Sequence, residues 1–195
     1  MSKKIALYFG TFNPIHLGHI IIANHFAEYS DLQEVWLVVT PCNPFKKKSE
    51  LISNYHRLEM VYLATHIYDN LRPSDIEFKL PQPNYTINTL AYISEKYPSY
   101  SFGIIMGEDN LKSFHKWKNY KAILDNYQVY VYPRISKGMS KVQFSNHPKI
   151  KMVKAPIIQI SSTAIRSAIK QQKSVRPLLP TEVWKYIDQM NFYKN

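Results

Sequence analysis

Residues 5–19 read IALYFGTFNPIHLGH, and this stretch decides the fold. It begins with the apolar run Ile5–Phe9, breaks at Gly10, and leads into residues 17–29, whose apolar positions recur at helical spacing. Val35–Thr40 is a second apolar, β-branched run. Strand, helix and strand in this order make a βαβ unit, which predicts parallel strands joined by a right-handed crossover.

The remainder of the chain continues this alternation. Helical spacing or breaker positions predict further helices at residues 54–68, 85–97, 162–171 and 181–190. Apolar runs predict further strands at residues 101–106, 128–132 and 150–153. Almost wholly apolar strands indicate burial on both faces of a sheet. We therefore expect a doubly wound α/β fold with a mainly parallel, Rossmann-like sheet, helices on both faces, and a C-terminal helical segment.

The domain organisation follows from chain length and from the polar stretches. A chain of 195 residues can bury one substantial core. The pair Arg72-Pro73 is a helix breaker, and residues 133–149 form a polar stretch typical of a long surface loop. We expect one domain over residues 1–195, with residues 160–195 as a helical segment packed on it.

Composition restricts the compartment and the class of metal site. Cys42 is the only cysteine, so an intramolecular disulfide and a zinc site of several thiolates are both excluded. The apolar run after Lys4 is too short for a secretory signal or a membrane span. We expect a cytoplasmic protein without a membrane partner.

The formal net charge of +11 favours anionic partners such as nucleotides or nucleic acid. The lysines are spread along the chain, apart from Lys46, Lys47 and Lys48. A spread of this kind is typical of a solvated basic surface, so we expect no nucleic-acid partner. A non-enzymatic basic RNA-binding module remains the alternative, and it would show steeply salt-dependent RNA binding without ATP turnover.

The decapeptide after the first strand has the residue types that a phosphate site needs. Gly10 allows backbone N–H groups to approach phosphate oxygens, and Thr11 adds a hydroxyl donor. Pro14 disfavours helical geometry at the residue before it, which delays the helix until His16 or its neighbour. The loop therefore presents a helix N-terminus, at the sheet edge where open α/β folds bind ligands.

His16 and His19 are three residues apart on one helical face, and Gly18 leaves room between them for a nucleotide. Two imidazoles and a helix dipole can stabilise the negative charge that develops on a triphosphate. A metal site on this pair is the weaker alternative, because no third ligand lies nearby in the sequence. The Walker pattern and the dinucleotide fingerprint are both missing from the sequence, so phosphate recognition falls to the histidine motif.

Two separated motifs carry a family resemblance. His16-Leu17-Gly18-His19 resembles the (T/H)xGH motif, and residues 160–166, ISSTAIR, resemble the late serine-rich motif, of one nucleotidyltransferase superfamily. Within it the chain looks most like the bacterial nicotinate-nucleotide adenylyltransferases, over essentially its whole length. The resemblance implies that nicotinate mononucleotide and ATP, with Mg²⁺, are converted to deamido-NAD and pyrophosphate in NAD biosynthesis.

Further blocks extend the resemblance, with two departures. Residues 41–46, PCNPFK, are similar to a basic loop of the family, but Phe45 stands where a histidine is often seen. Residues 106–111, MGEDNL, are similar to a Gly-Ala-Asp block, but Glu108 replaces the small residue. Arg57, Glu77 and residues 85–90 also match.

The resemblance implies three groups of site residues. The catalytic group is His16, His19 and Arg166. The residues implied to bind ATP are Gly10, Thr11, Phe12, His16, Gly18, His19, Gly107, Asp109, Ser162, Thr163 and Arg166. The residues implied to bind the mononucleotide are Asn13, Asn43, Lys46, Thr86, Trp117 and Arg134.

Several of these residues have a structural alternative that the sequence leaves open. Asp109 can bind ribose hydroxyls or Mg²⁺, although we expect the metal to be held mainly by the ATP phosphates. Trp117 can stack on a planar ring or lie in the core. Ser162 and Thr163 can bind phosphate or simply cap a helix, and Arg134 can meet a phosphate or lie on the surface.

In the expected mechanism the mononucleotide phosphate attacks the α-phosphorus of ATP in line, without a protein nucleophile. Pantetheine-phosphate adenylyltransferase is the near alternative, because it shares both motifs but lacks the block from Asp109 to Trp117. The preference for nicotinate over nicotinamide mononucleotide stays open. The oligomeric state stays open as well, and a homo-oligomer is compatible with the aromatic content.

Overall fold

The computed structural model describes residues 2–41, 51–134, 144 and 146–194. Within these residues a sheet of six parallel strands runs in the order β3-β2-β1-β4-β5-β6. The strands are β1 (Lys3–Gly10), β2 (Glu34–Val39), β3 (Leu71–Ser74), β4 (Tyr100–Gly107), β5 (Gln128–Tyr132) and β6 (Ile150–Met152). The expected mainly parallel sheet is confirmed, and every described pairing is parallel.

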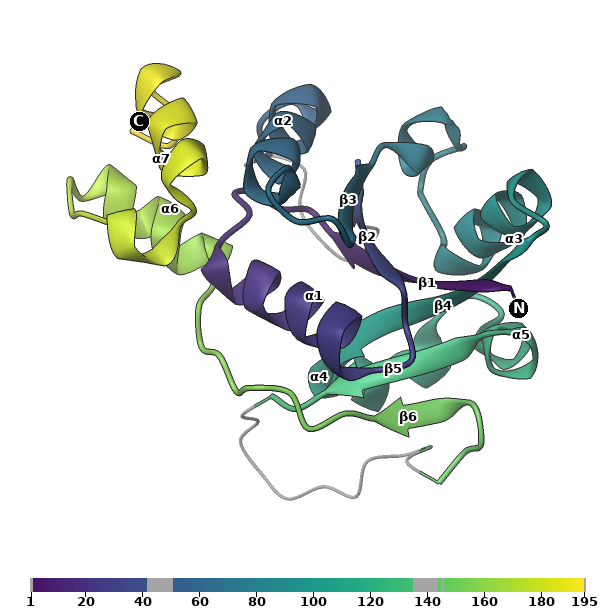
Figure 1. Cartoon of the computed structure of the whole chain (residues 1–195). Coiled ribbons are helices and arrows are strands. Elements are labelled where there is room, and N and C mark those ends of the chain that lie inside the picture. The colour runs from purple at the N-terminus through teal and green to yellow at the C-terminus, as the bar shows by residue number, and fades with distance from the viewer. Residues whose placement is uncertain (1, 42–50, 135–143, 145, 195) are drawn as a thin grey trace.

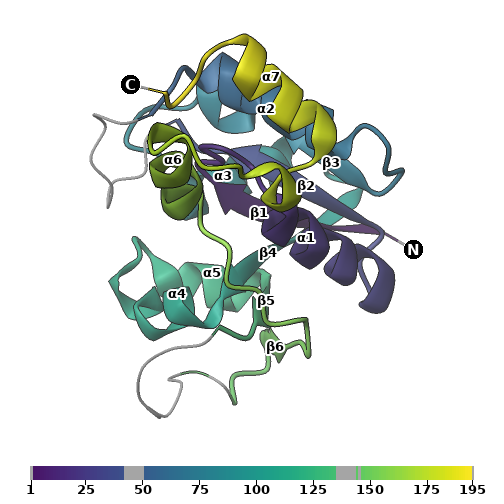
Figure 2. The ribbon, with the colours of Figure 1, turned by 90° about the vertical axis from the view of Figure 1, so that its left-hand side faces the viewer.

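Helices cover both faces of the sheet, as Figure 1 shows. The α-helices are α1 (Leu17–Tyr29), α2 (Asn54–Thr65), α3 (Thr86–Lys96), α4 (Glu108–Lys112), α5 (Tyr120–Asn126), α6 (Ser162–Lys170) and α7 (Thr181–Gln189). Short 3-10 turns are η2 (Ile76–Lys79), η3 (Phe114–Lys116) and η4 (Arg176–Leu178). Helix α7 packs beside α2, at the end of the molecule where β1 leads into α1 (Figures 1 and 2).

The two faces are assigned by the alternation of side chains along each strand. In β1, Ala6 and Tyr8 point to one core, which α1, α2, α6 and α7 close. Ile5 and Leu7 point to the other core, which α3, α4 and α5 close. Both cores are therefore built from the same strands, which explains why those strands read as continuous apolar runs.

The bounds of the expected helices and strands differ from the observed ones by at most three residues, whereas strand β3 and helices α4 and α5 were not expected. Strand β3 lies at the edge of the sheet, where Arg72 and Pro73 form part of the strand. Helix α2 ends at Thr65, before the breaker pair, and the pair lies inside β3, because an edge strand tolerates a proline that a central strand would not. Most of the polar stretch at 133–149 lies outside the described residues. No helix of the described ranges is both long and apolar enough to cross a lipid bilayer.

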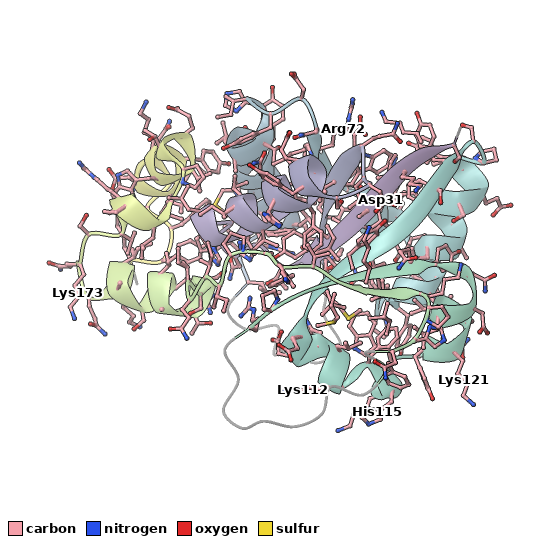
Figure 3. The ribbon with its side chains drawn as sticks, turned by 60° about the horizontal axis from the view of Figure 1, so that its bottom comes forward. Asp31, Arg72, Lys112, His115, Lys121 and Lys173 are labelled. Carbon is pink, nitrogen blue, oxygen red and sulfur yellow. The ribbon has the colours of Figure 1, made fainter. Side chains whose placement is uncertain are left out.

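The charged side chains labelled in Figure 3 are distributed around the molecule. Lys112 and Lys121 lie at one end of that view, Lys173 projects from the chain just after α6, and Arg72 lies on β3. These four basic residues thus lie on separate parts of the fold: β3, α4, α5 and the segment after α6.

Candidate active site

The strand order places two loops at the point where the sheet changes direction. Successive strands progress one way from β1 to β3 and the other way from β4 to β6, so the crevice opens where β1 and β4 pair. Open α/β folds bind ligands at this switch point, outside the carboxyl ends of the strands. The loop at residues 10–16 follows β1, and Gly107 ends β4. The first motif and the Gly107 block therefore meet at one edge.

The two histidines of the first motif form a stacked pair. His16 is the N-cap of α1, and its ring centroid lies 3.6 Å from that of His19, with 20° between the planes. The backbone N–H of His16 donates to Nδ1 of His19 over 3.2 Å. Because Nδ1 of His19 accepts this bond, the ring proton lies on Nε2, which can donate to a ligand.

The environment of His16 keeps its ring neutral. Its side chain is buried, and Nδ1 has no hydrogen-bond partner among the described residues. Burial, and secondarily the positive charge of Arg134, lowers the pKa of His16 to about 4. At neutral pH the ring is therefore an uncharged hydrogen-bonding group, and positive charge at the site comes from arginine and the helix dipole.

Close packing explains the two glycines of the motif. A Cβ at Gly10 would lie 2.7 Å from ring carbons of Phe12, and a Cβ at Gly18 would lie 3.1 Å from Nδ1 of His16. Phe12 has a positive φ of 44° and is fully buried, with its ring 5.1 Å from that of His19. The Phe12 ring thus packs edge-on against His19, and Gly10 leaves room for the Phe12 ring while Gly18 leaves room for the His16 ring.

A small pocket opens beside the pair. Its walls come from β1, α1, the end of β5 and the segment before α6: Tyr8, His16, Gly18, His19, Ile22, Tyr132, Arg134, Ile158 and Ile160. The hydroxyls of Tyr8 and Tyr132 lie 3.2 Å apart, and Arg134 Nη2 lies 3.5 Å from the Tyr132 hydroxyl. Arg134 therefore lines the histidine pocket, and its side chain is also 40% exposed to solvent.

The carboxylate of Asp109 faces the same pocket edge. Its Oδ1 is 3.9 Å from Nε of Arg134, and its side chain is about half exposed. A Cβ at Gly107 would lie only 2.3 Å from that Oδ1, so glycine is required for Asp109 to fold back over the end of β4. The residues that the structure describes contain no group of three or more His, Cys, Asp or Glu side chains that could hold a metal ion.

Two hydrogen bonds link the serine-rich motif to the loop at residues 10–16, which we call the signature loop. Their partners lie 148 and 153 residues apart in the sequence. Ser162 Oγ donates to the carbonyl of Pro14 over 2.9 Å, and Arg166 Nη1 donates to the carbonyl of Asn13, also over 2.9 Å. Ser161, not Ser162 or Thr163, caps helix α6, because its Oγ accepts from the N–H of Ala164. The capping alternative for Ser162 and Thr163 is therefore wrong by one residue.

The expected mononucleotide residues are only partly brought together. Asn13 and Arg134 lie at the signature loop and the histidine pocket. Thr86 is the first residue of α3, and Trp117 packs on Phe114 at 5.2 Å beside the second core, with no described contact to the histidines. Asn43 and Lys46 lie outside the described residues, as do Cys42 and Phe45.

Two residues that donate hydrogen bonds to the loop at residues 10–16 were not expected as site residues. Arg57 of α2 is fully buried, and its Nη1 donates to the carbonyls of Thr11 at 2.5 Å and Thr40 at 2.9 Å. Tyr193, near the chain end, donates its hydroxyl to Oδ1 of Asn13 at 2.8 Å. Both residues stand in blocks that resemble the family, Arg57 at residues 57–60 and Tyr193 at residues 191–193, but the sequence assigned neither of them a role in the site.

Comparison with protein families places the chain in a known group. Residues 7–168 match the cytidylyltransferase-like family. A protein of Christiangramia forsetii named "Probable nicotinate-nucleotide adenylyltransferase" is 65% identical over 194 residues, covering 100% of both chains. A protein of the same name from Cytophaga hutchinsonii is 50% identical over 98% of this chain and 99% of its own length.

Solved structures agree on the fold. The nicotinic acid mononucleotide adenylyltransferase of Plasmodium falciparum, complexed with NaAD, superposes with a TM-score of 0.82 at 19% identity, over 98% of this chain and 97% of that one. The doubly wound sheet, the paired histidines at its switch point and full-length relatives at high identity agree with one another. The chain belongs to the cytidylyltransferase-like family and, within it, to the nicotinate-nucleotide adenylyltransferases.

Proposed function

We propose that the chain joins nicotinate mononucleotide to the AMP part of ATP, yielding deamido-NAD and pyrophosphate as a step of NAD biosynthesis. The observation that carries this proposal is the 65% identity, over the full length, to a relative named for that reaction. The histidine pair beside a pocket at the switch point supplies the matching chemistry. The same reaction is named for a structural neighbour that holds NaAD.

The proposed mechanism needs no protein nucleophile, because a phosphate monoester is already ionised at neutral pH. The mononucleotide phosphate attacks the α-phosphorus in line, and the P–O bond to pyrophosphate breaks. Nε2–H of His19 and the neutral ring of His16 donate to triphosphate oxygens as charge moves onto pyrophosphate. Arg166 and the N-terminus of α1 contribute positive potential at the same place.

ATP is proposed to lie along the edge from Gly10 to the start of α6. The contacts that support this position are those of Ser162 and Arg166 with the signature loop. The residues proposed to bind ATP are Gly10, Thr11, Phe12, His16, Gly18, His19, Gly107, Asp109, Ser162, Thr163 and Arg166. Thr163 is exposed at the first turn of α6, where a hydroxyl and a backbone N–H can meet a phosphate.

Mg²⁺ is proposed as the divalent ion that accompanies ATP. When bound, it would supply positive charge that offsets the negative charge of the triphosphate. A single half-exposed carboxylate, Asp109, lies near the pocket, which fits a metal held chiefly by the substrate. Replacing Asp109 by Asn should therefore raise the Mg²⁺ concentration needed for half-maximal rate without abolishing turnover.

The mononucleotide is proposed to occupy the side of the switch point opposite ATP. Asn13 and Arg134 are supported by their positions in the signature loop and the histidine pocket. Thr86 starts a helix, where backbone N–H groups can receive a carboxylate or phosphate. Trp117, Asn43 and Lys46 complete the proposed set.

We also propose that residues 1–195 act as one domain. This is supported by Ile165 of α6 and Ile187 of α7, which lie in the first core.

The test is pyrophosphate release from ATP and Mg²⁺ with three acceptors at equal concentration. Nicotinate mononucleotide should be used in strong preference to nicotinamide mononucleotide and to phosphopantetheine. Preference for phosphopantetheine would favour the pantetheine-phosphate alternative and keep the mechanism. No release with any acceptor, together with tight and salt-sensitive RNA binding, would favour the basic-module alternative.

The histidine roles need a matched control on the same helix. His19→Ala should lower kcat by about a hundredfold or more, as for removal of one transition-state donor. His25 lies on α1 as well, but its ring stacks on Tyr29 at 5.0 Å, away from the pocket. His25→Ala should therefore retain turnover. Retained activity in a His16→Ala/His19→Ala double variant would refute the proposed mechanism.

A further inference from the structure

Four buried polar side chains lie where β2, η2 and α3 meet. Thr40 follows β2 and is 8% exposed, Glu77 of η2 is 1% exposed, Asn84 precedes α3 and is 6% exposed, and Thr89 of α3 is fully buried. We call these four residues the polar cluster. Burying polar groups costs free energy unless they are hydrogen-bonded, so the contacts within the cluster show which elements it holds together.

Hydrogen bonds to Glu77 connect η2 with the start of α3. Thr89 Oγ1 donates to Oε1 of Glu77 over 2.8 Å, and Asn84 Nδ2 donates to the backbone carbonyl of Glu77 over 3.1 Å. Thr89 Oγ1 also lies 3.5 Å from the carbonyl of Tyr85, but a hydroxyl has a single proton and the shorter contact is the one with the carboxyl. Glu77 therefore fixes Thr89, and with it the start of α3, to η2.

Two atoms of the polar cluster have no hydrogen-bond partner among the described residues: Oε2 of Glu77 and Oδ1 of Asn84. Both are acceptors when Glu77 is ionised, so neither can satisfy the other. A proton on Oε2 makes it a donor, and Asn84, whose side chain is already bonded to the Glu77 backbone, carries an acceptor that lacks a donor. The unpartnered atoms therefore fit a carboxylic acid better than a carboxylate.

The surroundings of Glu77 also favour its neutral form. Burial raises the pKa of Glu77, and hydrogen bonds from Thr89 and Thr40 oppose only part of that rise. Among the described residues no charged side chain shifts this pKa, and the groups that face Glu77 from α3 and from the end of β2 are hydroxyls. A buried carboxyl without a neighbouring cation takes up a proton, because burial of its charge would cost more.

The start of α3 is suited to an anion. Its N-cap is Tyr85, whose side chain makes no capping hydrogen bond, and the first turn contains no acidic residue. Lys118, which follows Trp117, places Nζ 4.4 Å from the centre of the Tyr85 ring. The positive end of the helix and an ammonium group thus lie together, which is favourable only when an anion binds beside them. An ionised Glu77 would weaken this positive potential, whereas a neutral Glu77 does not.

We propose that Glu77 is an uncharged positioning residue: its carboxylic acid group holds the start of α3 through Thr89 and adds no negative charge where Thr86 receives the mononucleotide. This inference rests on the proposed function and on the role of Thr86 within it. Thr86 and Thr89 are three residues apart on α3 and share one face of the helix. Loss of the Glu77 contact should weaken use of the mononucleotide and leave the use of ATP unchanged.

Two replacements of Glu77 separate its contact from its charge. Glu77→Gln is neutral and keeps an oxygen acceptor for Thr89, so KM for nicotinate mononucleotide should stay within about twofold of wild type. Glu77→Leu removes the acceptor, and this KM should rise about five- to tenfold, the effect of one lost hydrogen bond, with kcat and KM for ATP unchanged. An equal rise in both variants would mean that a carboxylate charge is required, and it would overturn the inference.

The hydroxyl at the other end of the contact has a matched control on α2. Thr89→Val removes the donor to Glu77, whereas Thr65→Val removes an equally buried hydroxyl that donates to the Val61 carbonyl of its own helix over 2.8 Å. KM for nicotinate mononucleotide should rise in Thr89→Val only, and Thr89→Ser, which keeps the hydroxyl, should restore it. An unchanged KM in Thr89→Val would contradict the inference. A lower kcat together with a rise in both KM values would show that the contact stabilises the fold and does not position the site.

Infrared spectroscopy tests the neutral carboxyl without substrate. At neutral pH the unliganded protein should show the C=O stretching band of a protonated carboxylic acid. The band should be missing in Glu77→Gln and retained in Glu95→Gln, whose side chain is exposed on the same helix as Thr89. Absence of the band from wild type would overturn the inference whatever the turnover assay gives. Absence of turnover in a wild-type chain that shows the band would instead refute the proposed function.

Discussion

The backbone N–H of His16 donates to Nδ1 of His19 while the two rings stack 3.6 Å apart. The pair is therefore fixed by the helix start that it forms, because the N-cap residue and the third helical residue hold each other. A neutral His16 and an Nε2–H donor on His19 are consequences of this arrangement. The first prediction follows from the buried, neutral state of His16.

The free energy of unfolding should decrease as the pH is lowered, partly because of His16. Its pKa is about 4 in the folded chain and near 6.5 when unperturbed, so the unfolded chain binds the extra proton between these values. Unfolding therefore becomes easier as pH falls from 6.5 to 4, by about 2 kcal/mol between pH 7.5 and pH 5. In urea unfolding, the free energy of unfolding should depend less on pH in His16→Asn than in wild type. His25→Asn is the control and should keep the pH dependence of wild type. Equal pH dependence in wild type and His16→Asn would contradict a neutral, buried His16.

Gly18→Ala should damage turnover more than stability. Alanine in the first turn of α1 gains about 1 kcal/mol of helix propensity over glycine, but its Cβ would lie 3.1 Å from both His16 Nδ1 and Ile158 Cγ2. These terms nearly cancel in the free energy of unfolding, whereas a displaced His16 ring lowers kcat by about ten- to a hundredfold. Steady-state kinetics and urea unfolding separate the two effects. Asn24→Ala, on the same helix, should leave kcat unchanged.

Arg57→Lys should destabilise the loops that follow β1 and β2. The guanidinium reaches the carbonyls of Thr11 and Thr40 from one planar group, which an ammonium cannot reproduce. Unsatisfied buried carbonyls should cost about 2–4 kcal/mol of unfolding free energy. Arg72→Lys is the control, because Arg72 pairs with Glu34 but its own side chain is 56% exposed. A similar loss in both variants would show that burial of Arg57 is not the cause.

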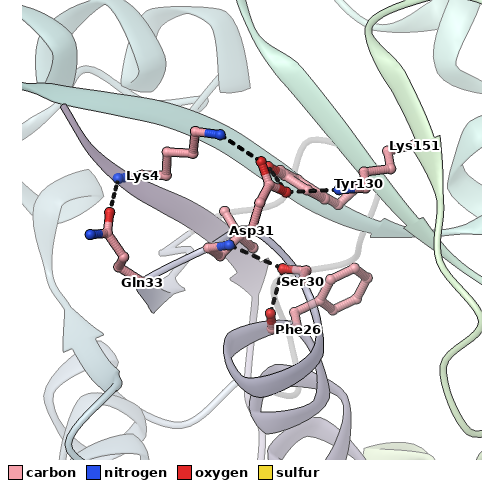
Figure 4. A network of polar contacts seen from close by, with 8 residues as sticks. Lys4, Phe26, Ser30, Asp31, Gln33, Tyr130 and Lys151 are labelled. Carbon is pink, nitrogen blue, oxygen red and sulfur yellow. Dashed lines mark hydrogen bonds and ion pairs between the residues drawn. The ribbon is translucent and has the colours of Figure 1, made fainter. Parts of the chain in front are cut away.

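Asp31→Asn should reduce stability without touching catalysis. Figure 4 shows its carboxylate between Lys4, Lys151 and Tyr130, which joins β1, β5 and β6 at the sheet edge opposite the candidate site. Hydrogen bonds from Lys151 and Lys4 hold the pKa of Asp31 well below its usual value, so this stabilisation is present above pH 4 and is lost at lower pH. Because the side chain is 41% exposed, the loss should be only about 0.5–1 kcal/mol.

High salt provides the check on that interpretation. Screening should shrink the difference in unfolding free energy between wild type and Asp31→Asn, and both KM values should match those of wild type. A salt-independent loss would mean that packing, and not charge, accounts for the effect. A changed KM would mean that loss of the Asp31 contacts alters substrate binding at the candidate site.

Local patterns in the sequence predicted most of the fold. The runs at residues 5–9 and 128–132 have the composition of buried strands, and helix α1 has the bounds that its apolar spacing indicates. Strand β3 escaped prediction because Arg72 and Pro73 are poor strand formers, and only its edge position makes the pairing acceptable. Whether a strand lies at the edge or in the centre of a sheet depends on the strand order. The sequence of a single segment does not specify that order.

The sequence by itself determined the alternation of strands and helices, the two motifs, and the family to which they point, because these are local patterns of residue type and spacing. Tertiary structure alone decided that Ser162 and Arg166 bind the loop that holds the first motif. It also decided that Arg57 is buried and that Tyr193 reaches Asn13. The physical reason is that a hydrogen bond between residues about 150 or 180 positions apart depends on where the whole chain has folded, and neither partner's local sequence specifies that place.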